Sequence, residues 1–185
     1  VNTDFTAPTA KTGLVYNEAE QEIATAGAFI GKFAAELEAA GAKFQYPTDS
    51  LPTATAVGTY DFIWKIDLGT STNFTYPSAY TTVNGATIVE ATITDADVTV
   101  PVGATDLKYI LDTPQQLIKT GAVVATDNGK GAPKGVAYYS VDGGTWTDDL
   151  TKVTGEHVKA NGEKYVISWY IKGNGNYVDY GSETT

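Results

Sequence analysis

Two stretches of the chain alternate hydrophobic and polar residues with the period of a β-strand. Their apolar positions are Tyr60, Phe62, Trp64 and Ile66 in the first stretch and Tyr165, Ile167, Trp169 and Ile171 in the second. Successive side chains of a strand point to opposite faces, so each stretch predicts a strand with one aromatic, apolar face. We expect Trp64 and Trp169, with Tyr60 and Tyr165, to lie at equivalent depth in a hydrophobic core.

Turn residues separate the predicted strands at short intervals. The run from Tyr138 to Trp146 contains Asp142-Gly143-Gly144. Asp and Gly tolerate the positive φ values of hairpin turns, so this run predicts a strand, a tight turn and a second strand. The chain has 28 Thr, 12 Tyr and 19 Gly, a composition that favours strands and turns. Together these features predict an all-β fold made of antiparallel β-sandwiches.

Five blocks of sequence recur in the same order, at spacings from 93 residues (Leu14 to Leu107) to 105 (Tyr60 to Tyr165). The matched blocks are 14–16 with 107–109, 21–27 with 115–121, 44–49 with 137–142, 60–66 with 165–171, and 73–74 with 176–177. We interpret them as two copies of one domain, residues 1–94 and 95–185. Residues 87–93 are expected to form the last strand of the first domain, and residues 98–102 to open the second.

One segment departs from strand periodicity. Its apolar residues, at helical spacing, are Phe29, Ile30, Phe33, Ala34 and Leu37, and Gly41 follows as a candidate C-terminal cap. This predicts a helix over about 28–40, inserted in the first domain only, because residues 123–131 of the second domain have the pattern of a loop. The helix could be a lid, with Phe29 and Phe33 in the core, or a docking surface that presents them to a neighbouring subunit.

The blocks of the second domain resemble a bacterial immunoglobulin-like repeat that occurs in tandem in large surface proteins. The motifs are Gln115 to Gly121, the Tyr139-Ser140-Val141-Asp142-Gly143-Gly144-Thr145-Trp146 hairpin, and Tyr165 to Gly173 followed by Asn174 and Asn176. The first domain keeps Gly58-Thr59-Tyr60 but has Tyr46 to Ser50 in place of the hairpin, without its Trp. The resemblance implies two tandem immunoglobulin-like sandwiches. Such repeats serve as stalks, spacers and adhesive modules, and related domains decorate phage virions.

The last strand differs between the two predicted domains. About 17 residues follow Tyr76 before the expected boundary, whereas Thr185 stands nine residues after Asn176. The final strand of the second domain is therefore expected to be short or missing. Either the sequence is truncated there, or the open edge is completed by strand addition from another chain.

Composition and charge narrow the function classes. With 22 acidic residues, 12 Lys and no Arg, the formal net charge is −10, which disfavours binding to nucleic acid or an anionic membrane surface. No apolar run reaches the ~20 residues of a membrane-spanning helix. The chain has no Cys, which excludes thiol chemistry and cysteine-ligated metals.

Candidate catalytic groups are few, and we expect neither an enzyme nor a cofactor. His157 is the single candidate for a histidine base, but it lies in a polar connection without a Gly-x-Ser-x-Gly motif. The carboxylate pairs Asp148/Asp149 and Glu36/Glu38 are spaced so that their side chains point apart.

Two weaker candidate sites remain. Asp95 and Asp97 could bind a structural calcium ion at the domain junction, although the full calcium loop motif is absent and a solvated acidic turn is the simpler interpretation. Trp146, with Tyr138, Tyr170 and Tyr180, could form a platform for glycans.

The sequence thus predicts a non-catalytic structural or interaction module, a spacer or an adhesion or assembly domain of a larger extracellular protein or particle. The expected partners are other protein subunits of a cell-surface or virion assembly, possible contacts being Phe29, Phe33 and Trp146. A phage virion protein, such as a capsid decoration or head-fibre subunit, is the first alternative. A carbohydrate-binding adhesin is the second.

Overall fold

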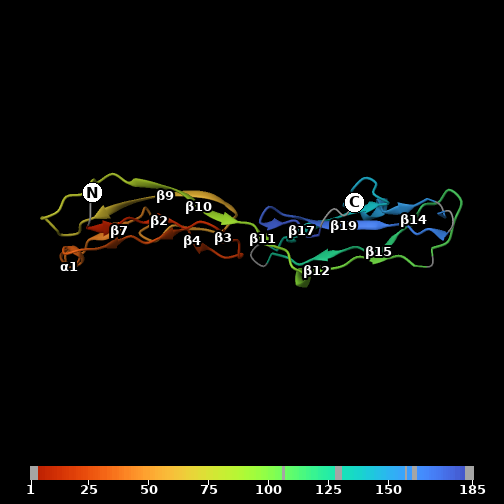
Figure 1. Cartoon of the computed structure of the whole chain (residues 1–185), viewed down its shortest axis with the longest axis horizontal. Helices are drawn as coiled ribbons and strands as arrows, with labels where there is room; N and C mark the ends of the chain where they lie inside the picture. The colour runs from red at the N-terminus through yellow and green to blue at the C-terminus, as the bar shows by residue number, and fades with distance from the viewer. Residues whose placement is uncertain (1–3, 106, 128–130, 157, 160–161, 182–185) are drawn as a thin grey trace. The chain divides into compact units, whose positions relative to one another are not determined.

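A computed structural model describes residues 4–105, 107–127, 131–156, 158–159 and 162–181. The chain divides into two compact units, residues 1–89 and 90–185. Nearly all regular structure in the described residues is β-strand, with one short α-helix in the first unit (Figure 1), so the predicted all-β class is confirmed. In this part of the chain, no helix has the length and hydrophobicity needed to span a bilayer.

The first unit contains a four-stranded sheet and three short strand pairs. The sheet order is β3 (Leu14–Val15), β10 (Thr81–Val89), β9 (Gly58–Asp67) and β7 (Lys43–Gln45). The strand pairs are β1 (Phe5–Thr6) with β6 (Ala28–Phe29), β2 (Thr9–Ala10) with β5 (Ala24–Thr25), and β4 (Gln21–Glu22) with β8 (Thr53–Ala54). All these pairings are antiparallel except that of β10 with β3, which is parallel. In Figure 1, β9 and β10 form one layer over β2 and β4.

The core of the first unit confirms the alternation predicted for β9. Phe62, Trp64 and Ile66 are buried together with Ala24 and Tyr46. The Trp64 ring is enclosed by three aromatic rings, those of Phe5, Phe44 and Tyr76, with centroids 5.9, 5.5 and 6.2 Å away. Tyr60, at the start of the strand, is partly exposed and donates its hydroxyl hydrogen to the carbonyl of Ala56 at 2.7 Å.

The predicted helix over 28–40 is wrong in its first part. The helix α1 covers only Ala34–Ala39, and Ala28–Phe29 form β6, paired with β1. Gly31, at φ +77, lies between them in a conformation that no α-helix contains. Strand pairing with Phe5 therefore overrides the helical spacing. The predicted cap is confirmed, since Gly41 has φ +76 and donates its N–H to Glu38 O at 3.0 Å.

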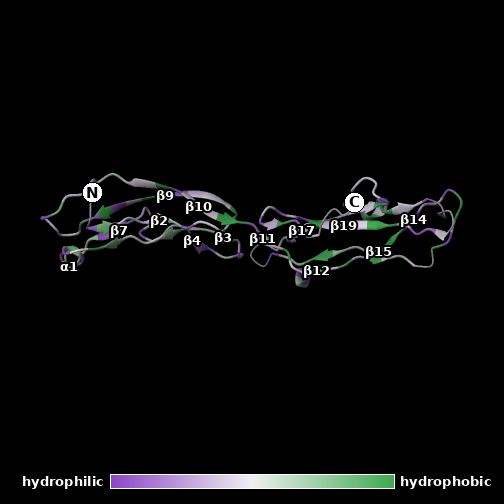
Figure 2. Cartoon of the chain, viewed as in Figure 1, coloured by the Kyte–Doolittle hydropathy of each residue, from purple (hydrophilic) through white to green (hydrophobic). Residues whose placement is uncertain are grey.

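The second unit consists of one longer antiparallel strand pair and several pairs of short strands. The long pair is β17 (Gly135–Val141) with β19 (Ile167–Gly173). The short pairs are β12 (Val98–Thr99) with β16 (Val123–Val124), β13 (Val102–Gly103) with β15 (Ile118–Thr120), β14 (Gln115–Gln116) with β18 (Thr154–Gly155), and β11 (Ala91–Thr92) with β20 (Tyr177–Val178). Only β11 with β20 is parallel. Figure 2 shows hydrophobic residues on β15 and β19 and more polar residues in the connections.

Two expectations about strand boundaries fail here. Residues 87–93 do not form one strand of the first unit: β10 ends at Val89, while Ala91–Thr92 pair with Tyr177–Val178 in the second unit. Val123–Val124, predicted as loop, form β16 because they pair with β12. Both segments are two-residue strands whose existence depends on a partner distant in sequence. The predicted strand and tight turn are confirmed, since β17 ends at Val141 and Asp142 and Gly143 have φ +52 and +73. The predicted second strand is wrong, because after the turn only Thr147 pairs with Tyr139, in an isolated bridge.

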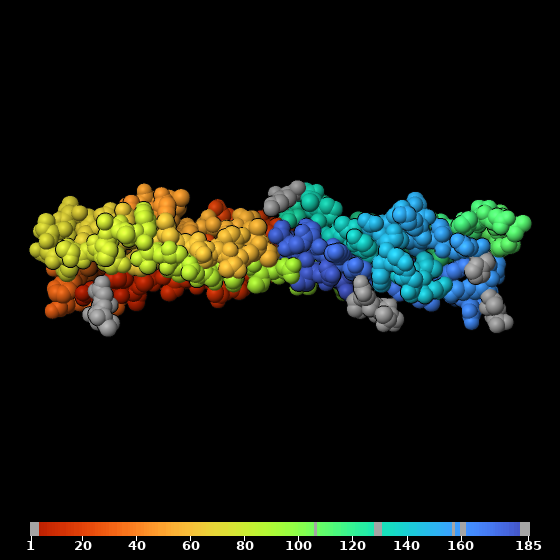
Figure 3. All heavy atoms as spheres, turned by 90° about the horizontal axis from the view of Figure 1, so that it is seen from above, coloured from red at the N-terminus to blue at the C-terminus, as the bar shows by residue number. Residues whose placement is uncertain are grey.

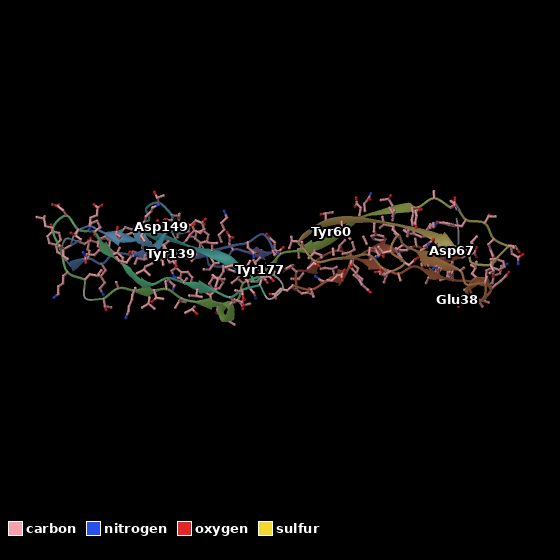
Figure 4. All side chains as sticks on the ribbon, turned by 180° about the vertical axis from the view of Figure 1, so that it is seen from behind. Glu38, Tyr60, Asp67, Tyr139, Asp149 and Tyr177 are labelled. Atoms are coloured by element: carbon pink, nitrogen blue, oxygen red, sulfur yellow. The ribbon has the colours of Figure 1, made fainter. Side chains whose placement is uncertain are left out.

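The core of the second unit contains Leu117, Ile118, Tyr139 and Val153, against which Trp169 packs while remaining partly exposed. Tyr139, labelled in Figure 4, lies directly opposite Trp169 in the ladder. The expectation of equal depth for the two tryptophans is therefore wrong. Where Phe44 pairs with Ile66 and covers Trp64, the second unit has the smaller Ala137 paired with Ile171.

One residue of the second matched block, Ile23 in the first unit and Leu117 in the second, makes a corresponding pair of backbone hydrogen bonds in each unit. The Lys11 N–H donates to Ile23 O, and the Ile23 N–H donates to Pro52 O. At the corresponding positions of the second unit, the Ala104 N–H donates to Leu117 O and the Leu117 N–H donates to Val153 O. In each unit, the backbone of this buried aliphatic residue therefore links an earlier segment of the chain to a later one.

A pair of matched substitutions tests the buried tyrosines. The Ala122 N–H donates to the Tyr139 hydroxyl at 2.6 Å, whereas the equally buried Tyr46 hydroxyl lies near the backbone of Gly27 without a hydrogen bond of good geometry. We expect Tyr139→Phe to lower the free energy of unfolding by about 1–2 kcal/mol, because it leaves a backbone N–H unsatisfied. Tyr46→Phe should cost less than about 0.5 kcal/mol, since it removes an unpaired polar group. Urea denaturation followed by tryptophan fluorescence measures both, and equal losses would contradict the assignment.

Candidate functional site

A groove of about 600 Å³ opens at one end of the second unit. One wall is the segment before β14, with Leu107, Tyr109 and Ile110. The other wall is formed by Tyr165, just before β19, and by Ile167, the first residue of β19. Leu107, Tyr109 and Ile110 are all exposed, and Figure 3 shows this stretch (bright green) on the surface of the unit. A second hollow, of about 150 Å³, is lined by Ile167 and Trp169 further along β19.

The walls of the groove are apolar and its rim is charged. Lys108, Lys159 and Lys164 contribute ammonium groups, and Glu156 and Glu163 contribute carboxylates. Lys159 is held in place, since its Nζ lies 2.7 Å from the Asp142 carboxylate and 4.9 Å from the centre of the Tyr165 ring. The Lys159 ammonium and the Val166 N–H lower the pKa of Asp142, so this ion pair ties the hairpin turn to the approach to β19.

Sequence reasoning did not single out this groove as a site. Two features of the sequence pointed to this region. Leu107 and Tyr109 of the groove wall match Leu14 and Tyr16 of the first domain, and the second domain was expected to have a short or missing last strand. In the described residues, that end of the chain provides β20 and a single bridge between Tyr180 and Ile171. Residues 182–185 lie outside the described part, so the predicted short or missing final strand stays a prediction.

The aromatic residues predicted as a glycan platform come together in part. Tyr138 and Tyr170 pair across β17 and β19 and stack, with ring centroids 5.5 Å apart. Trp146, beyond the hairpin turn, meets Tyr170 edge to face at 5.0 Å. These three residues, called here the aromatic cluster, lie on the face opposite the buried Tyr139. Tyr180 is not part of it, since its ring lies 6.3 Å from Trp169 and its hydroxyl donates to Asp95 at 2.8 Å.

The acidic residues Asp95 and Asp97 form a capped 3-10 turn, η1 (Asp95–Asp97). Asp97 accepts hydrogen bonds from the N–H and hydroxyl of Thr94, each at 2.9 Å, and pairs with Lys134 at 2.9 Å. The Thr94 N–H first, and then Lys134, hold the pKa of the Asp97 carboxyl below its ordinary value. Among the described residues, no group of three or more His, Cys, Asp or Glu side chains could hold a metal ion.

The remaining sequence candidates have structural neighbours. Phe29 packs into the core against Phe44, with centroids 5.0 Å apart, whereas Phe33 contacts Phe74 at 5.3 Å beside α1. Glu36 accepts a hydrogen bond from Asn73 at 2.8 Å, and Asp149 caps the turn η2 (Leu150–Lys152) by accepting from Thr151. His157 lies outside the described residues.

Comparisons with protein-family models, with curated proteins and with solved structures found no match to this chain. The groove, the aromatic cluster and the strand pairings are therefore the features that bear on the function of this chain.

Acid titration tests the ion pair at η1. Because the folded-state pKa of Asp97 is lowered, its stabilisation is present above the unfolded value of about 4 and is lost as the pH falls through the folded value. We expect Asp97→Asn to lower the free energy of unfolding at pH 7 by about 1 kcal/mol, and the gap from the natural chain to shrink towards pH 3. Asp148→Asn, at an exposed carboxylate elsewhere in the second unit, is the control and should leave the free energy of unfolding unchanged within about 0.5 kcal/mol at pH 7. A gap that stays constant with pH would contradict the role of Asp97.

Proposed function

We propose that this chain is a non-catalytic structural and interaction module made of two copies of one immunoglobulin-like β-sandwich. The observation that carries the proposal is that three strand pairings of the first unit have counterparts in the second unit. In an antiparallel pair, a slip of one residue moves every side chain to the other face of the sheet. Two unrelated β-folds would therefore not share a register by accident over several pairs.

The agreement extends along both units. Phe5–Thr6 pair with Ala28–Phe29 as Val98–Thr99 pair with Val123–Val124. The pairing of Gln21 with Ala54 corresponds to that of Gln115 with Gly155, and the pairing of Phe44 with Ile66 corresponds to that of Ala137 with Ile171. The pairings of Phe44 with Ile66 and of Ala137 with Ile171 join residues of the matched blocks, and the other pairings include residues of those blocks or lie beside them. This supports a duplicated sandwich and the resemblance to tandem bacterial repeats.

The charged groups support a scaffold role. Asp97 closes the turn η1, Asp142 closes the hairpin through Lys159 and Val166, and Asp149 caps η2. In each case a carboxylate stabilises a connection between strands. Carboxylates of this kind hold loops in one conformation, which is what a module that presents surfaces to partners requires.

We place the module on a cell surface or a virion, outside the cell, with other protein subunits of the assembly as its partners. The acidic, threonine-rich exterior favours display in solvent, and a net charge of −10 disfavours contact with nucleic acid. A capsid decoration or head-fibre subunit of a phage is the first alternative form of the same proposal.

Cross-linking of native material tests the assignment. Lysine-directed cross-linking of intact cells and of purified virions, followed by mass spectrometry, should recover this chain joined to other envelope or capsid proteins. The cellular and virion samples distinguish the two locations. Recovery from the soluble cell contents alone, without cross-links to other proteins, would contradict the proposal.

A carbohydrate-binding adhesin is the second candidate, favoured by the aromatic cluster. Apolar faces of sugar rings stack on Trp and Tyr side chains, and Trp146 at a hairpin is partly exposed. If the cluster binds a glycan, Trp146→Ala should weaken binding at least tenfold in a fluorescence titration. Tyr80→Ala, at an exposed aromatic residue of the first unit, should leave it unchanged. A glycan array without any hit on the natural chain would exclude this candidate.

A further inference from the structure

We propose that Asn84-Gly85, in a β-bulge of β10, is a site at which the folded chain modifies itself. The modification is deamidation of Asn84 through a cyclic imide, assisted by the carboxylate of Asp61, and its co-reactant is water. The products carry aspartate or isoaspartate at position 84 and remain folded. This site lies in the first unit and is independent of the proposed function.

The bulge places these two residues outside the regular ladder of β9 and β10. Asn84 and Gly85 together lie opposite the single residue Asp61. The flanking pairs of the ladder are Val83 with Phe62 and Ala86 with Tyr60. Gly85 has φ +85, and apart from the adjoining residues no atom lies within 4 Å of the position that a Cβ would take there. The backbone nitrogen of Gly85 is therefore open to approach by the side chain of Asn84.

Asp61 and Asn84 supply the two side chains that the reaction needs. The Gly85 N–H donates to Asp61 Oδ1 at 3.1 Å. A carboxylate at this distance from the proton to be removed meets the geometric requirement for a general base. The Asn84 side chain is exposed and, within the residues that the structure describes, makes no hydrogen bond. It can therefore turn towards the Gly85 nitrogen without breaking one.

The reaction balances without an oxidant or a reductant. The Gly85 nitrogen gives its proton to the Asp61 carboxylate and attacks Cγ of Asn84, which closes the imide ring. The Cγ–Nδ2 bond breaks, and Nδ2 takes up that proton and leaves as ammonia. Water then opens the ring. Cleavage of the new N–Cγ bond gives aspartate, and cleavage of the original peptide bond to Gly85 gives isoaspartate.

The second unit contains the same dipeptide in a restrained form. Gly175 also has a positive φ, +91, with open space where a Cβ would stand. However, Asn174 Nδ2 donates to Pro133 O at 2.9 Å, and Asn174 Oδ1 accepts from the Asn176 N–H at 3.1 Å. These hydrogen bonds fix the side-chain amide, and the first must break as Nδ2 leaves. We therefore expect Asn174 to react at least about tenfold more slowly than Asn84.

The bulge also accounts for a product that stays folded. Isoaspartate lengthens the backbone by one methylene group, at a point that already contains an extra residue. In a regular stretch of the ladder, a shift of the pairing would move core side chains to the outer face. Between the flanking pairs of the bulge, the added length is absorbed locally, so Phe62 and Trp64 are expected to stay buried.

Peptide mapping of the full chain tests the proposal. Trypsin places the four Asn-Gly pairs of the sequence, 84–85, 128–129, 161–162 and 174–175, in four different peptides, and the comparison uses the first and the last. The chain is kept at neutral pH for several days, folded or in urea, and mass spectrometry with electron-transfer fragmentation then locates aspartate and isoaspartate. In the folded chain, position 84 should convert at least about tenfold faster than position 174. In urea the two rates should agree within about twofold, because the dipeptide is the same and its native neighbours are lost.

Matched variants of two carboxylates on β9 test the role of Asp61. Asp61→Asn keeps an oxygen that can accept from the Gly85 N–H but removes the base, so conversion at position 84 should slow at least about threefold. Asp67→Asn, on the same strand, should leave the rate unchanged. Tryptophan fluorescence checks that each variant is folded.

Several results would overturn the proposal. One is an Asn84 that stays unmodified, or converts no faster than Asn174, in a folded chain whose urea sample converts at both positions. Another is an equal or faster rate at position 84 in Asp61→Asn. Rates in urea that differ by the same factor as in the folded chain would assign the difference to the sequence instead of the bulge. Loss of the native tryptophan fluorescence in the deamidated chain, separated by its added negative charge, would show that modification unfolds the unit.

Discussion

The register between each tryptophan-bearing strand and its hydrogen-bonded partner is the constraint on which both units depend. In the first unit, β7 meets β9 so that Phe44 faces Ile66, and in the second, β17 meets β19 so that Ala137 faces Ile171. This register directs Trp64, Trp169 and Tyr139 towards the cores and leaves Tyr138 and Tyr170 on the outside. A shift of one residue would expose the core aromatic residues and bury the outer ones. The register therefore determines which side chains form the core.

The two units differ in how this common arrangement is closed. In the first unit, β10 extends over nine residues and covers Tyr16, Phe62 and Trp64 with the rest of its sheet. In the second unit, the corresponding walls remain open around the groove, and Trp169 stays partly exposed. The smaller Ala137 in place of Phe44 adds to this opening. In the described residues, the second unit therefore leaves more apolar surface uncovered beside its long strand pair than the first unit does.

Two ion pairs link the segments that connect strands of the second unit. Lys134 pairs with Asp97 and lies 5.2 Å from the centre of the Tyr177 ring, and Lys159 pairs with Asp142. These contacts join η1 to the segment before β17 and the hairpin to the approach to β19. They are partly shielded from solvent, so they hold more tightly than ion pairs in open water.

Local pattern alone determined the strands around Trp64 and Trp169, the tight turn at Asp142-Gly143 and the Gly41 cap, because alternation and positive φ are properties of neighbouring residues. It also revealed the matched blocks, Leu107 and Tyr109 included. Only the tertiary structure decided that Ala28–Phe29 are strand, that Ala91–Thr92 pair in the second unit, that Trp169 is shallower than Trp64, and that Tyr109 lines a groove. Each of these depends on a partner tens of residues away. Whether two residues form a strand, and whether a ring is exposed, depends on the segments that pack beside them. The local periodicity of the sequence does not specify those segments.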